Sequence, residues 1–309
     1  MDTRDVVLAD AFAAEPTGGV PVAVLPDGAD LTDDQLRTVA QELDAPVATV
    51  PTDGSPDALR ALGPRGPADR RSVAVGGFAV AADRGWVDAG TYTPTVAGHA
   101  RDVTVDDDCR VWVDLDEPDP RPADADPGAV ADALGVPAAA LRDVGADLPP
   151  VRVSAGVDAL AVPVNFLEHL GSARPDRVAL ADLAAEGGVA AVCAFTFDTL
   201  AADATCHART FVAPGDAGDG NTPDHPTRSR IVGTEVPVAP TVAAATAIHL
   251  SRETVVEADD PVVEVGHYLD RPGRVHADPD GVRAGGRAPP SLDGMVAVPP
   301  PDDGDILEV

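Results

Sequence analysis

The sequence predicts an α/β protein in two blocks, one near residues 1–118 and one near residues 125–299. In both blocks, short segments with the alternation of strands take turns with segments that have the 3.6-residue period of helices. The chain has 309 residues, which is enough for two domains of ordinary size. Apolar residues make up 44% of it and aromatic residues 3%, so the core is expected to consist mainly of Val, Ala and Leu.

The first block is expected to begin with two strands and a capped helix. Thr32 and Gln35 have the spacing of a capping box at the start of this helix, and Pro46 ends it. Gly85 is a suitable cap for a second, Ala-rich helix, and the acidic turn 106–108 joins two later strands into a hairpin. In chain order, strands are expected at 6–8, 21–25, 47–50, 91–96, 102–105 and 110–115, and helices at 32–43 and 72–84.

A stretch dense in Pro and Asp, residues 116–127, separates the two blocks. We therefore expect a first domain over 1–118, a second domain over 119–299 and an acidic tail over 300–309. Asp126 and Pro127 open the first helix of the second block, and Gly135 ends it. Strands are then expected at 151–153, 160–164 and 190–197, helices at 176–185 and 240–250, and further strands and turns toward the tail.

The net charge of −30 comes from an unusual set of residues. The chain contains no lysine, and 42 of its 52 acidic residues are Asp, dispersed along the whole length. This excess of carboxylates argues against nucleic acid and against anionic membranes as partners, because both are bound through clustered Lys and Arg. Dispersed short carboxylates hold water and counter-ions, which favours a halophilic protein of a salt-adapted cytoplasm. A GC-rich genome is the alternative explanation.

Cysteine usage and the N-terminus also favour a cytoplasmic location. Cys109, Cys193 and Cys206 have no regular spacing, and an odd, low number indicates a reducing compartment without a disulfide framework. Residues 1–5 are charged and lack the apolar segment of a signal peptide, and no apolar run approaches the roughly 20 residues needed to span a bilayer. The seven His residues are scattered without metal-ligand spacing, so no metal is expected.

Several segments, taken in order, resemble the phenazine-biosynthesis-type (PhzF-like) isomerase family. Asp10-Ala11-Phe12, followed by a Gly-Val-Pro run, resembles the family's D-A-F…G-N-P start. Arg60 to Pro64 resembles its R-x-F-T-P strand and turn. The other matching segments, which extend the resemblance over nearly the whole chain, are Ala40 to Leu43, Pro149 to Gly156, Val162 to Val164, Arg174 to Asp176, Arg209 to Pro214, Glu264 to His267, Arg271 to Arg274 and Gly285-Gly286.

The resemblance implies a fold of two similar halves, each a curved mixed β-sheet around a central helix, as in diaminopimelate-epimerase-like enzymes. It places the active site in the cleft between the halves, where a proton is moved between carbons of a small cyclic or amino-acid-like metabolite. It also implies a homodimer that uses no metal and no organic cofactor.

The family's catalytic base is the position at which this sequence departs most from the pattern. The base is a Glu in an N-x-S-E-T motif after the first helix, and here that position holds Val47, which cannot transfer a proton. Asp44 occupies the Asn position of the motif and is one acid that could substitute. Its alternative role is that of a solvated or capping residue at the helix end.

The motif that opens the next helix in the family, G-H-(P/A)-T, is also altered. It binds a substrate carboxylate on backbone N–H groups at a helix N-terminus. The matching stretch here contains Ser72 and Val73 but no His, and Gly76 and Gly77 follow within the same helix. We expect these four residues to line the substrate site.

The third motif of the family, E-D-P-A-T-G-S-A, is matched by residues 223–229. Asp224 and His225 could form an acid–base pair there, or could belong to a surface loop. Ser229 or Arg228 takes the place of a glycine that lets the backbone approach a ligand, and we expect Ser229 in the substrate site. No Cys lies at the positions of the paired thiols of two-thiol epimerases, so that chemistry is not expected.

Two functions remain open on the sequence. The first is an isomerase or epimerase of a biosynthetic process whose site has changed and which uses Asp44, or Asp224 with His225. The second is a catalytically inactive homologue, with a degenerate active site, that acts as a binding or structural protein. A serine hydrolase is not supported, since Ser72 and Ser154 lack the G-x-S-x-G context.

Overall fold

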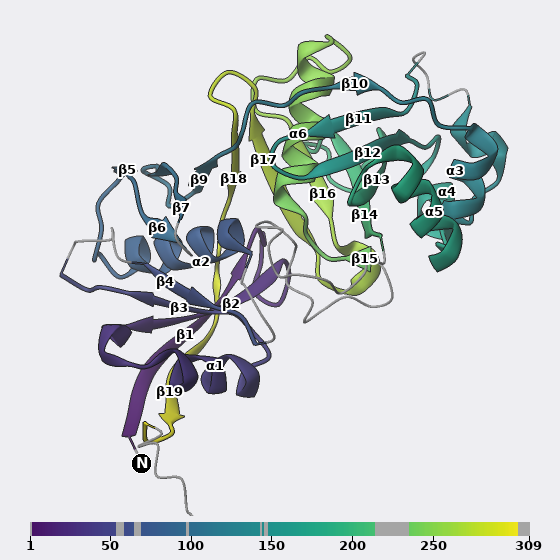
Figure 1. Cartoon of the computed structure of the whole chain (residues 1–309). Coiled ribbons are helices and arrows are strands. Elements are labelled where there is room, and N and C mark those ends of the chain that lie inside the picture. The colour runs from purple at the N-terminus through teal and green to yellow at the C-terminus, as the bar shows by residue number, and fades with distance from the viewer. Residues whose placement is uncertain are drawn as a thin grey trace, which may run out of the picture.

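The computed structural model describes residues 2–53, 59–64, 69–96, 99–142, 144, 148–213 and 235–301. They form a mixed α/β fold in two lobes (Figure 1), which confirms the predicted fold class. One lobe holds the N-terminal strands and the first two helices, and the other holds the remaining helices. In the described part of the chain, no helix is long and apolar enough to cross a membrane.

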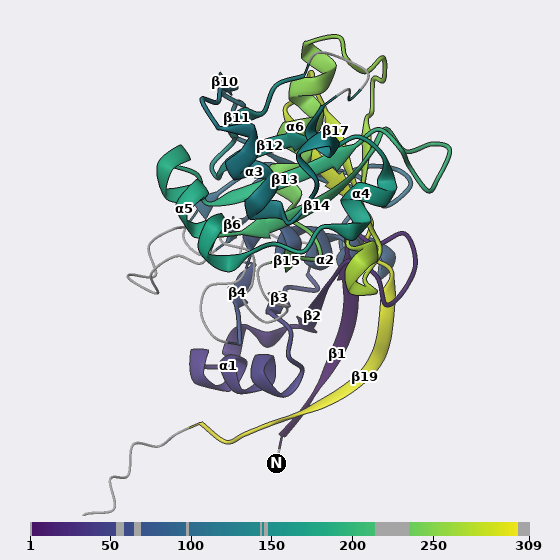
Figure 2. The same ribbon diagram turned by 90° about the vertical axis from the view of Figure 1, so that its right-hand side faces the viewer.

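The sheet of the first lobe brings both ends of the described chain together. Its strands are β1 (Asp2–Ala11), β2 (Val20–Pro26), β3 (Val47–Val50), β4 (Arg60–Leu62) and β19 (Pro290–Val298). They pair in the order β19-β1-β2-β3-β4. The antiparallel neighbours β1 and β19 run side by side in Figures 1 and 2.

Two helices cover opposite faces of this sheet. α1 (Asp33–Glu42) packs on one face and α2 (Arg70–Asp83) on the other. Because successive side chains of a strand point to opposite faces, neighbouring residues of β3 belong to different cores. Val47 packs in the cluster that contains α1, and Ala48 packs in the cluster that contains α2.

A larger sheet runs from the second lobe into the first. Among the described residues it has twelve strands, whose order is β10-β11-β12-β13-β14-β16-β17-β18-β9-β8-β5 with β15 beside β14. A small hairpin of β6 (Thr95–Val96) and β7 (His99–Ala100) stands apart. The strands of the large sheet are β5 (Gly90–Tyr92), β8 (Val103–Val105), β9 (Val111–Asp114), β10 (Arg121–Pro122), β11 (Val151–Ser154), β12 (Asp158–Pro163), β13 (Ala191–Thr196), β14 (Cys206–Val212), β15 (Glu235–Val236), β16 (Val262–Val265), β17 (Gly273–Asp278) and β18 (Arg283–Gly286).

The central helix of the second lobe is α6 (Pro240–Arg252), which packs against β11, β12 and β16 to β18. All of its residues from Pro240 to Leu250 are buried except His249, just as every residue of α2 from Arg71 to Ala81 is buried. A separate core holds the helices α3 (Pro127–Leu134), α4 (Leu167–Ser172) and α5 (Arg177–Gly187). The short 3-10 segments are η1 (Gly28–Asp30), η3 (Ala138–Leu141) and η5 (His267–Leu269).

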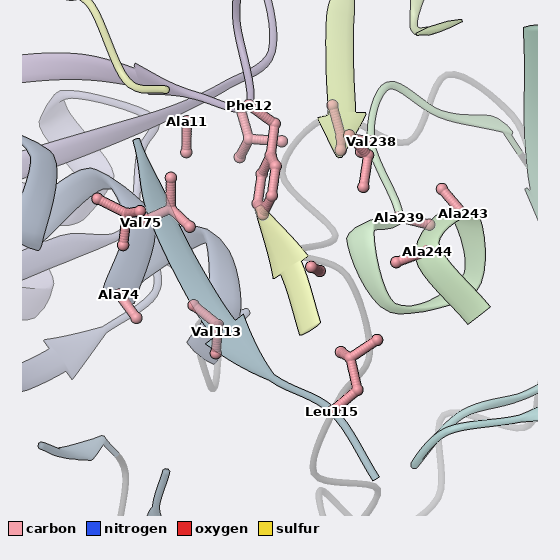
Figure 3. Packing of buried hydrophobic residues seen from close by; sticks show 14 of the residues in the cluster. Ala11, Phe12, Ala74, Val75, Val113, Leu115, Val238, Ala239, Ala243 and Ala244 are labelled. Atoms are coloured by element: carbon pink, nitrogen blue, oxygen red, sulfur yellow. The ribbon is translucent and has the colours of Figure 1, made fainter. Parts of the chain in front are cut away.

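The two lobes share one apolar core, seen from close by in Figure 3. Phe12 is fully buried there, and its carbonyl accepts a hydrogen bond of 2.7 Å from the backbone N–H of Arg274. A Cβ at Gly286 would lie 2.5 Å from Cδ1 of Phe12, so only a glycine fits under this ring. Val75 of α2 and Ala243 of α6 belong to the same core, which therefore fixes the two central helices relative to each other.

The local predictions from the sequence are confirmed with one exception. Thr32 Oγ1 accepts from the backbone N–H of Gln35 at 3.3 Å, and Gln35 Oε1 accepts from the N–H of Thr32 at 3.0 Å, which completes the capping box. Asp126 caps α3, and Gly135 ends it at φ 64°. The exception is the strand expected at 91–96, which is divided between β5 and β6 around Pro94, a residue without a backbone donor.

The predicted domain division stays a prediction, and one strand pairing crosses it. Residues 290–298 are expected in the second domain, whereas β19 pairs with β1 along eight residues and completes the sheet of the first lobe. Strand pairing joins segments at opposite ends of the chain, and no local signal in the sequence reports it. The boundary at residue 118 stays a prediction. Of the expected tail, only residues 300 and 301 lie within the described residues.

Candidate functional site

A cavity that is partly open to solvent, with about 390 Å³ of empty space including the open part, lies between the lobes, at the point where both central helices begin. Asp69, the N-cap of α2, lines one side of it, and the first turn of α6 lines another. Strands β13 and β14 contribute the remaining walls, together with Val157 and Ala190, which directly precede β12 and β13. The lining residues are Asp69, Val157, Ala190, Ala191, Thr210, Val212, Ala239, Pro240, Thr241 and Val242.

Asp69 is the charged side chain among these described lining residues. It is only 5% exposed, and it accepts hydrogen bonds from the backbone N–H groups of Arg71, at 3.3 Å, and Ser72, at 3.1 Å. The hydroxyl of Ser72 donates a further short hydrogen bond to it. The positive end of the α2 dipole also favours a carboxylate at this place. Among the described lining residues, the fold therefore holds one acid, in a fixed orientation, beside side chains that carry no charge.

The first turn of α6 offers the complementary group. Its N-cap is Ala239, which has no side-chain oxygen, and no side chain of the described residues caps this helix. Pro240, the first residue of the helix, has no N–H, but the N–H groups of Thr241 and Val242 lie in the first turn, where a helix provides no internal partner. Such a turn is suited to bind an anionic group of a ligand.

The structure does not bring the expected base positions into this cavity. Val47 has no exposed surface and packs with Leu25 and Leu36 in the core under α1, on the face of the sheet that points away from α2. Asp44 is exposed at the end of α1, with φ 45°. Neither residue is among those that line the cavity. Strand alternation places the side chain after Val47, that of Ala48, in the core on the α2 face of the sheet.

The four residues expected at the start of the second helix take two different positions. Ser72 is fully buried and reaches the cavity indirectly, through its hydrogen bond to Asp69. Val73 is buried in the shared apolar core. Gly76 and Gly77 allow the helix to approach the sheet, because a Cβ at either would lie 2.8 Å from an atom of Val22 or Leu59.

The positions expected in the second half, Asp224, His225 and Ser229, lie outside the described residues. The segment that leads into α6 is instead 235–239, where Glu235 and Pro237 have the spacing of the first and third residues of the E-D-P-A-T-G-S-A motif. This E-x-P spacing before an Ala-rich helix is a signal in the sequence for the start of α6. The sequence signal that could have indicated Asp69 is its position as an Asp directly before α2, where an N-cap residue is favoured.

Glu235 is held by a buried ion pair. Arg209 Nε donates to Glu235 Oε1 at 2.9 Å, and Arg209 Nη2 donates to Oε2 at 2.6 Å. Nη1 of the same arginine donates to the carbonyl oxygens of Leu170, at 2.8 Å, and Ala173, at 3.2 Å. With its charge paired in this way, Glu235 positions the segment that leads into α6, and it is not among the residues that line the cavity.

Buried thiols and imidazoles of the second lobe lie outside the cavity lining. Burial raises the pKa of Cys193 to about 11, and it also raises the pKa of Cys206, so neither thiol is an active nucleophile. His207 Nδ1 lies 3.1 Å from Glu264 Oε2 in a fully buried pair. Over the described ranges, no group of three or more His, Cys, Asp or Glu side chains is arranged to hold a metal ion.

A search of protein-family models gives no match to this chain. The chain is similar to an uncharacterized isomerase of Bacillus subtilis (strain 168), YfhB, with 26% identity over 302 residues that cover 95% of this chain and 96% of the relative. The similarity to this relative therefore extends over nearly the full length of both chains.

Solved structures identify the fold more closely. A phenazine biosynthesis protein of the PhzF family from Bacillus anthracis matches with a TM-score of 0.76 and 18% identity, over 96% of this chain and 100% of the other. A predicted epimerase from Pseudomonas aeruginosa matches with a TM-score of 0.68 and 21% identity, over the same shares. A PhzF-family protein from Enterococcus faecalis has a TM-score of 0.68 at 16% identity, again over 96% and 100%. The chain therefore has the fold of the PhzF-family isomerases.

Proposed function

We propose that this protein is a PhzF-like isomerase that moves a proton between carbons of a small metabolite, in the cavity between its lobes, with Asp69 as the base. One observation supports this most: the carboxylate of Asp69 stands at one wall of a cavity whose other described walls are apolar or carry threonine. A carboxylate beside apolar walls meets the requirement for abstraction of a proton from carbon.

The geometry suggests how such a substrate would be held. A carboxylate of the substrate would bind the N–H groups of Thr241 and Val242 at the uncapped start of α6. The reacting carbon would then face Asp69 across the cavity, and the carboxylate of Asp69 would take its proton. The electron pair of the C–H bond moves into an adjacent unsaturated group, and the same acid returns the proton at the other end of that group. The hydroxyl of Thr210 can donate to negative charge that develops on oxygen.

A non-catalytic binding or structural role is the second candidate function. The observation in its favour is Val47, which is fully buried under α1 at the position of the family's Glu. Asp224 and His225 remain candidates for a second acid in either case, and we also expect a cytoplasmic homodimer without a cofactor. These expectations rest on the resemblance to the family.

The enzyme proposal is tested by Asp69→Asn in D2O, with a panel of small cyclic and amino-acid-like carboxylic acids. Asparagine is also a good N-cap, so this variant keeps the start of α2 while it removes the base. We expect the wild-type protein to incorporate deuterium into one of these acids, and Asp69→Asn to lower the rate by about 100-fold or more, the usual contribution of a general base. Mass spectrometry and NMR measure the incorporation.

Two variants control this experiment. Asp44→Asn should keep the wild-type rate, because Asp44 is exposed at the end of α1 and does not line the cavity. Asp224→Asn reports whether the segment outside the described residues contributes. An unchanged rate of deuterium incorporation in Asp69→Asn would refute the assignment of Asp69 as the base. If the wild-type protein incorporates no deuterium into any acid of the panel, the non-catalytic role is favoured.

Restoring the family's residue with Val47→Glu should not create activity. The side chain would enter the apolar core between the sheet and α1, where a carboxylate has no partner among the residues of that cluster. We expect the free energy of unfolding to fall by roughly 3 kcal/mol or more, as for other unpaired buried charges. Chemical denaturation measures this change. A stable variant with new isomerase activity would show that position 47 can reach the cavity.

A further inference from the structure

Strand β19 forms one outer edge of the five-stranded sheet in the first lobe. Among the described residues it pairs with β1 alone, and Figure 2 shows it along the outside of the lobe. The backbone N–H and C=O groups on its outer side therefore have no partner from the described strands. A row of such groups is a template for pairing with another strand.

The strands at the other ends of the two large sheets are protected against such pairing. β4 has three residues and begins with Arg60, β5 has three residues, and β10 consists of Arg121 and Pro122. Short strands, charged side chains and proline are devices by which proteins keep sheet edges from pairing. β19 has nine residues, and its proline, Pro290, stands at the first position. It is therefore the one long edge among the described strands that end these two sheets.

The side chains of β19 also differ from the rest of the surface. Leu292 is 49% exposed and Met295 is 66% exposed. Leu292 lies opposite Leu8 on the α1 face of the sheet, and alternation places Met295 on the α2 face. Asp293 is the one charged residue of the strand, and Arg84 at the end of α2 donates a short hydrogen bond to it. Because the chain has a net charge of −30, two copies repel each other at most surfaces, but at β19 they would bring few charges together.

We propose that two copies of this chain associate through β19, by antiparallel pairing of their β19 strands about a twofold axis, so that their sheets join into one. An antiparallel edge is complementary to its own copy, because both present the same pattern of donors and acceptors. With the axis at Gly294, Leu292 lies opposite Val296 of the partner subunit, which forms an apolar pair on the α1 face. On the α2 face Asp293 lies opposite Met295 of the partner subunit, so no two carboxylates of the paired strands face each other.

The net charge makes this association depend on salt. Two copies of charge −30 repel each other at low ionic strength, and added KCl screens the repulsion without weakening backbone hydrogen bonds or apolar contacts. The dimer should therefore tighten as salt rises, whereas a dimer held by ion pairs would loosen. The resemblance to the family implies a homodimer without locating its interface. A dimer through another surface would thus keep that expectation and overturn this proposal, and neither result depends on isomerase activity.

The test is analytical ultracentrifugation of the full chain in 0.1 M and 2 M KCl. We expect a dimer in 2 M KCl, with a dissociation constant about tenfold lower or more than in 0.1 M KCl. Met295→Asp removes an apolar contact and places a carboxylate opposite Asp293 of the partner subunit, so it should weaken the dimer by about tenfold or more. Val178→Asp is the matched control, because Val178 is a 70% exposed residue of α5 in the other lobe and the variant gains the same charge. This control should associate like the wild type.

Hydrogen exchange of the backbone amides locates the contact. Alternate amides of β19 point away from β1, and we expect them to exchange slowly in the wild-type dimer and rapidly in Met295→Asp. A monomeric wild type in 2 M KCl, or a dimer that weakens equally in Met295→Asp and Val178→Asp or in neither, would overturn the proposal. Slow exchange of these amides in a monomer would show that another segment of the same chain covers the edge, which also overturns it. Thermal unfolding of each variant verifies that it is folded.

Discussion

At the scale of the residue, the most distinctive group outside the cavity is the buried imidazole of His207. It faces Glu264 at 3.1 Å, and its ring lies 4.8 Å from that of His267 and 5.6 Å from that of Tyr268. Arg209 stacks on the same Tyr268 ring at 4.6 Å. Burial, and then the neighbouring His267, lower the pKa of His207 more than Glu264 raises it. The folded protein therefore holds this imidazole in its neutral form.

The lowered pKa predicts a loss of stability on acidification. An unfolded His titrates near pH 6.5, so below that pH the unfolded chain binds protons that the folded His207 resists, and the free energy of unfolding falls. Burial also lowers the pKa values of His249 and His276, which act in the same direction. In His207→Asn, whose amide can still donate to Glu264, we expect the free energy of unfolding to fall less between pH 7 and pH 5 than in the wild type. Urea unfolding at several pH values measures this change. An equal fall in the variant and the wild type would assign the acid sensitivity to other groups, such as His249 and His276.

At the scale of the element, four of the described helices begin directly after a residue whose side chain caps them. Thr32, Asp69, Asp126 and Asp176 each accept backbone N–H donors of the helix that follows them. The exception among the central helices is α6, which begins after Ala239 without a side-chain cap. Because the cap of α2 is an acid and α6 has none, the two helix starts present unlike groups to the cavity between them. This difference is the basis of the proposed base and of the proposed carboxylate site.

The capping box of α1 gives a prediction at this scale. Thr32→Ala removes the acceptor for the N–H of Gln35 and should lower the free energy of unfolding by about 1 kcal/mol, as for other N-caps. Thr38→Ala is the matched control, because Thr38 is an exposed threonine inside the same helix whose hydroxyl bonds only to the carbonyl of Asp34 among the described residues. We expect the control to stay within about 0.5 kcal/mol of the wild type. Equal losses in both variants would show that the cap contributes nothing specific.

At the scale of the whole molecule, the dominant property is the net charge of −30. The arginines are spread among the acids in exposed pairs, such as Arg37 with Asp34 and Arg4 with Asp30. Exposed pairs of this kind contribute little each, up to about 1 kcal/mol, and they leave most of the carboxylates without a cation. The folded state therefore carries a large self-repulsion at low salt.

Adaptation to salt is a prediction that follows from this charge. The screening length falls from about 10 Å at 0.1 M salt to about 3 Å at 1 M, which is shorter than most distances between surface charges. We expect the free energy of unfolding to rise by more than about 1 kcal/mol between 0.1 M and 2 M KCl, an effect as large as that of a typical destabilising mutation. Urea unfolding at fixed pH measures it. Full stability at 0.1 M KCl would refute a halophilic protein and favour genome composition as the origin of the excess of Asp.

Local signals in the sequence predict the local elements of this protein correctly. The capping box at Thr32, the Pro127 start and Gly135 end of α3, and the hairpin of β8 and β9 all appear where the residues predicted them. These signals act within a few residues, through a single hydrogen bond or a restricted backbone angle, so a single sequence is enough to read them. The motifs that resemble the PhzF-like family also predict the overall fold, because they occur in the family's order over nearly the whole chain.

Only the tertiary structure decided which side chains meet. The pairing of β19 with β1, the burial of Val47 under α1 and the position of Asp69 beside the start of α6 all depend on contacts between residues far apart in the chain. A shift of one residue along a strand exchanges its faces, so the faces of Val47 and Ala48 follow from the register of β3 with its neighbours. The acid of the cavity was therefore not the one that the motif indicated, because a cavity collects its residues through packing and not through their order in the chain.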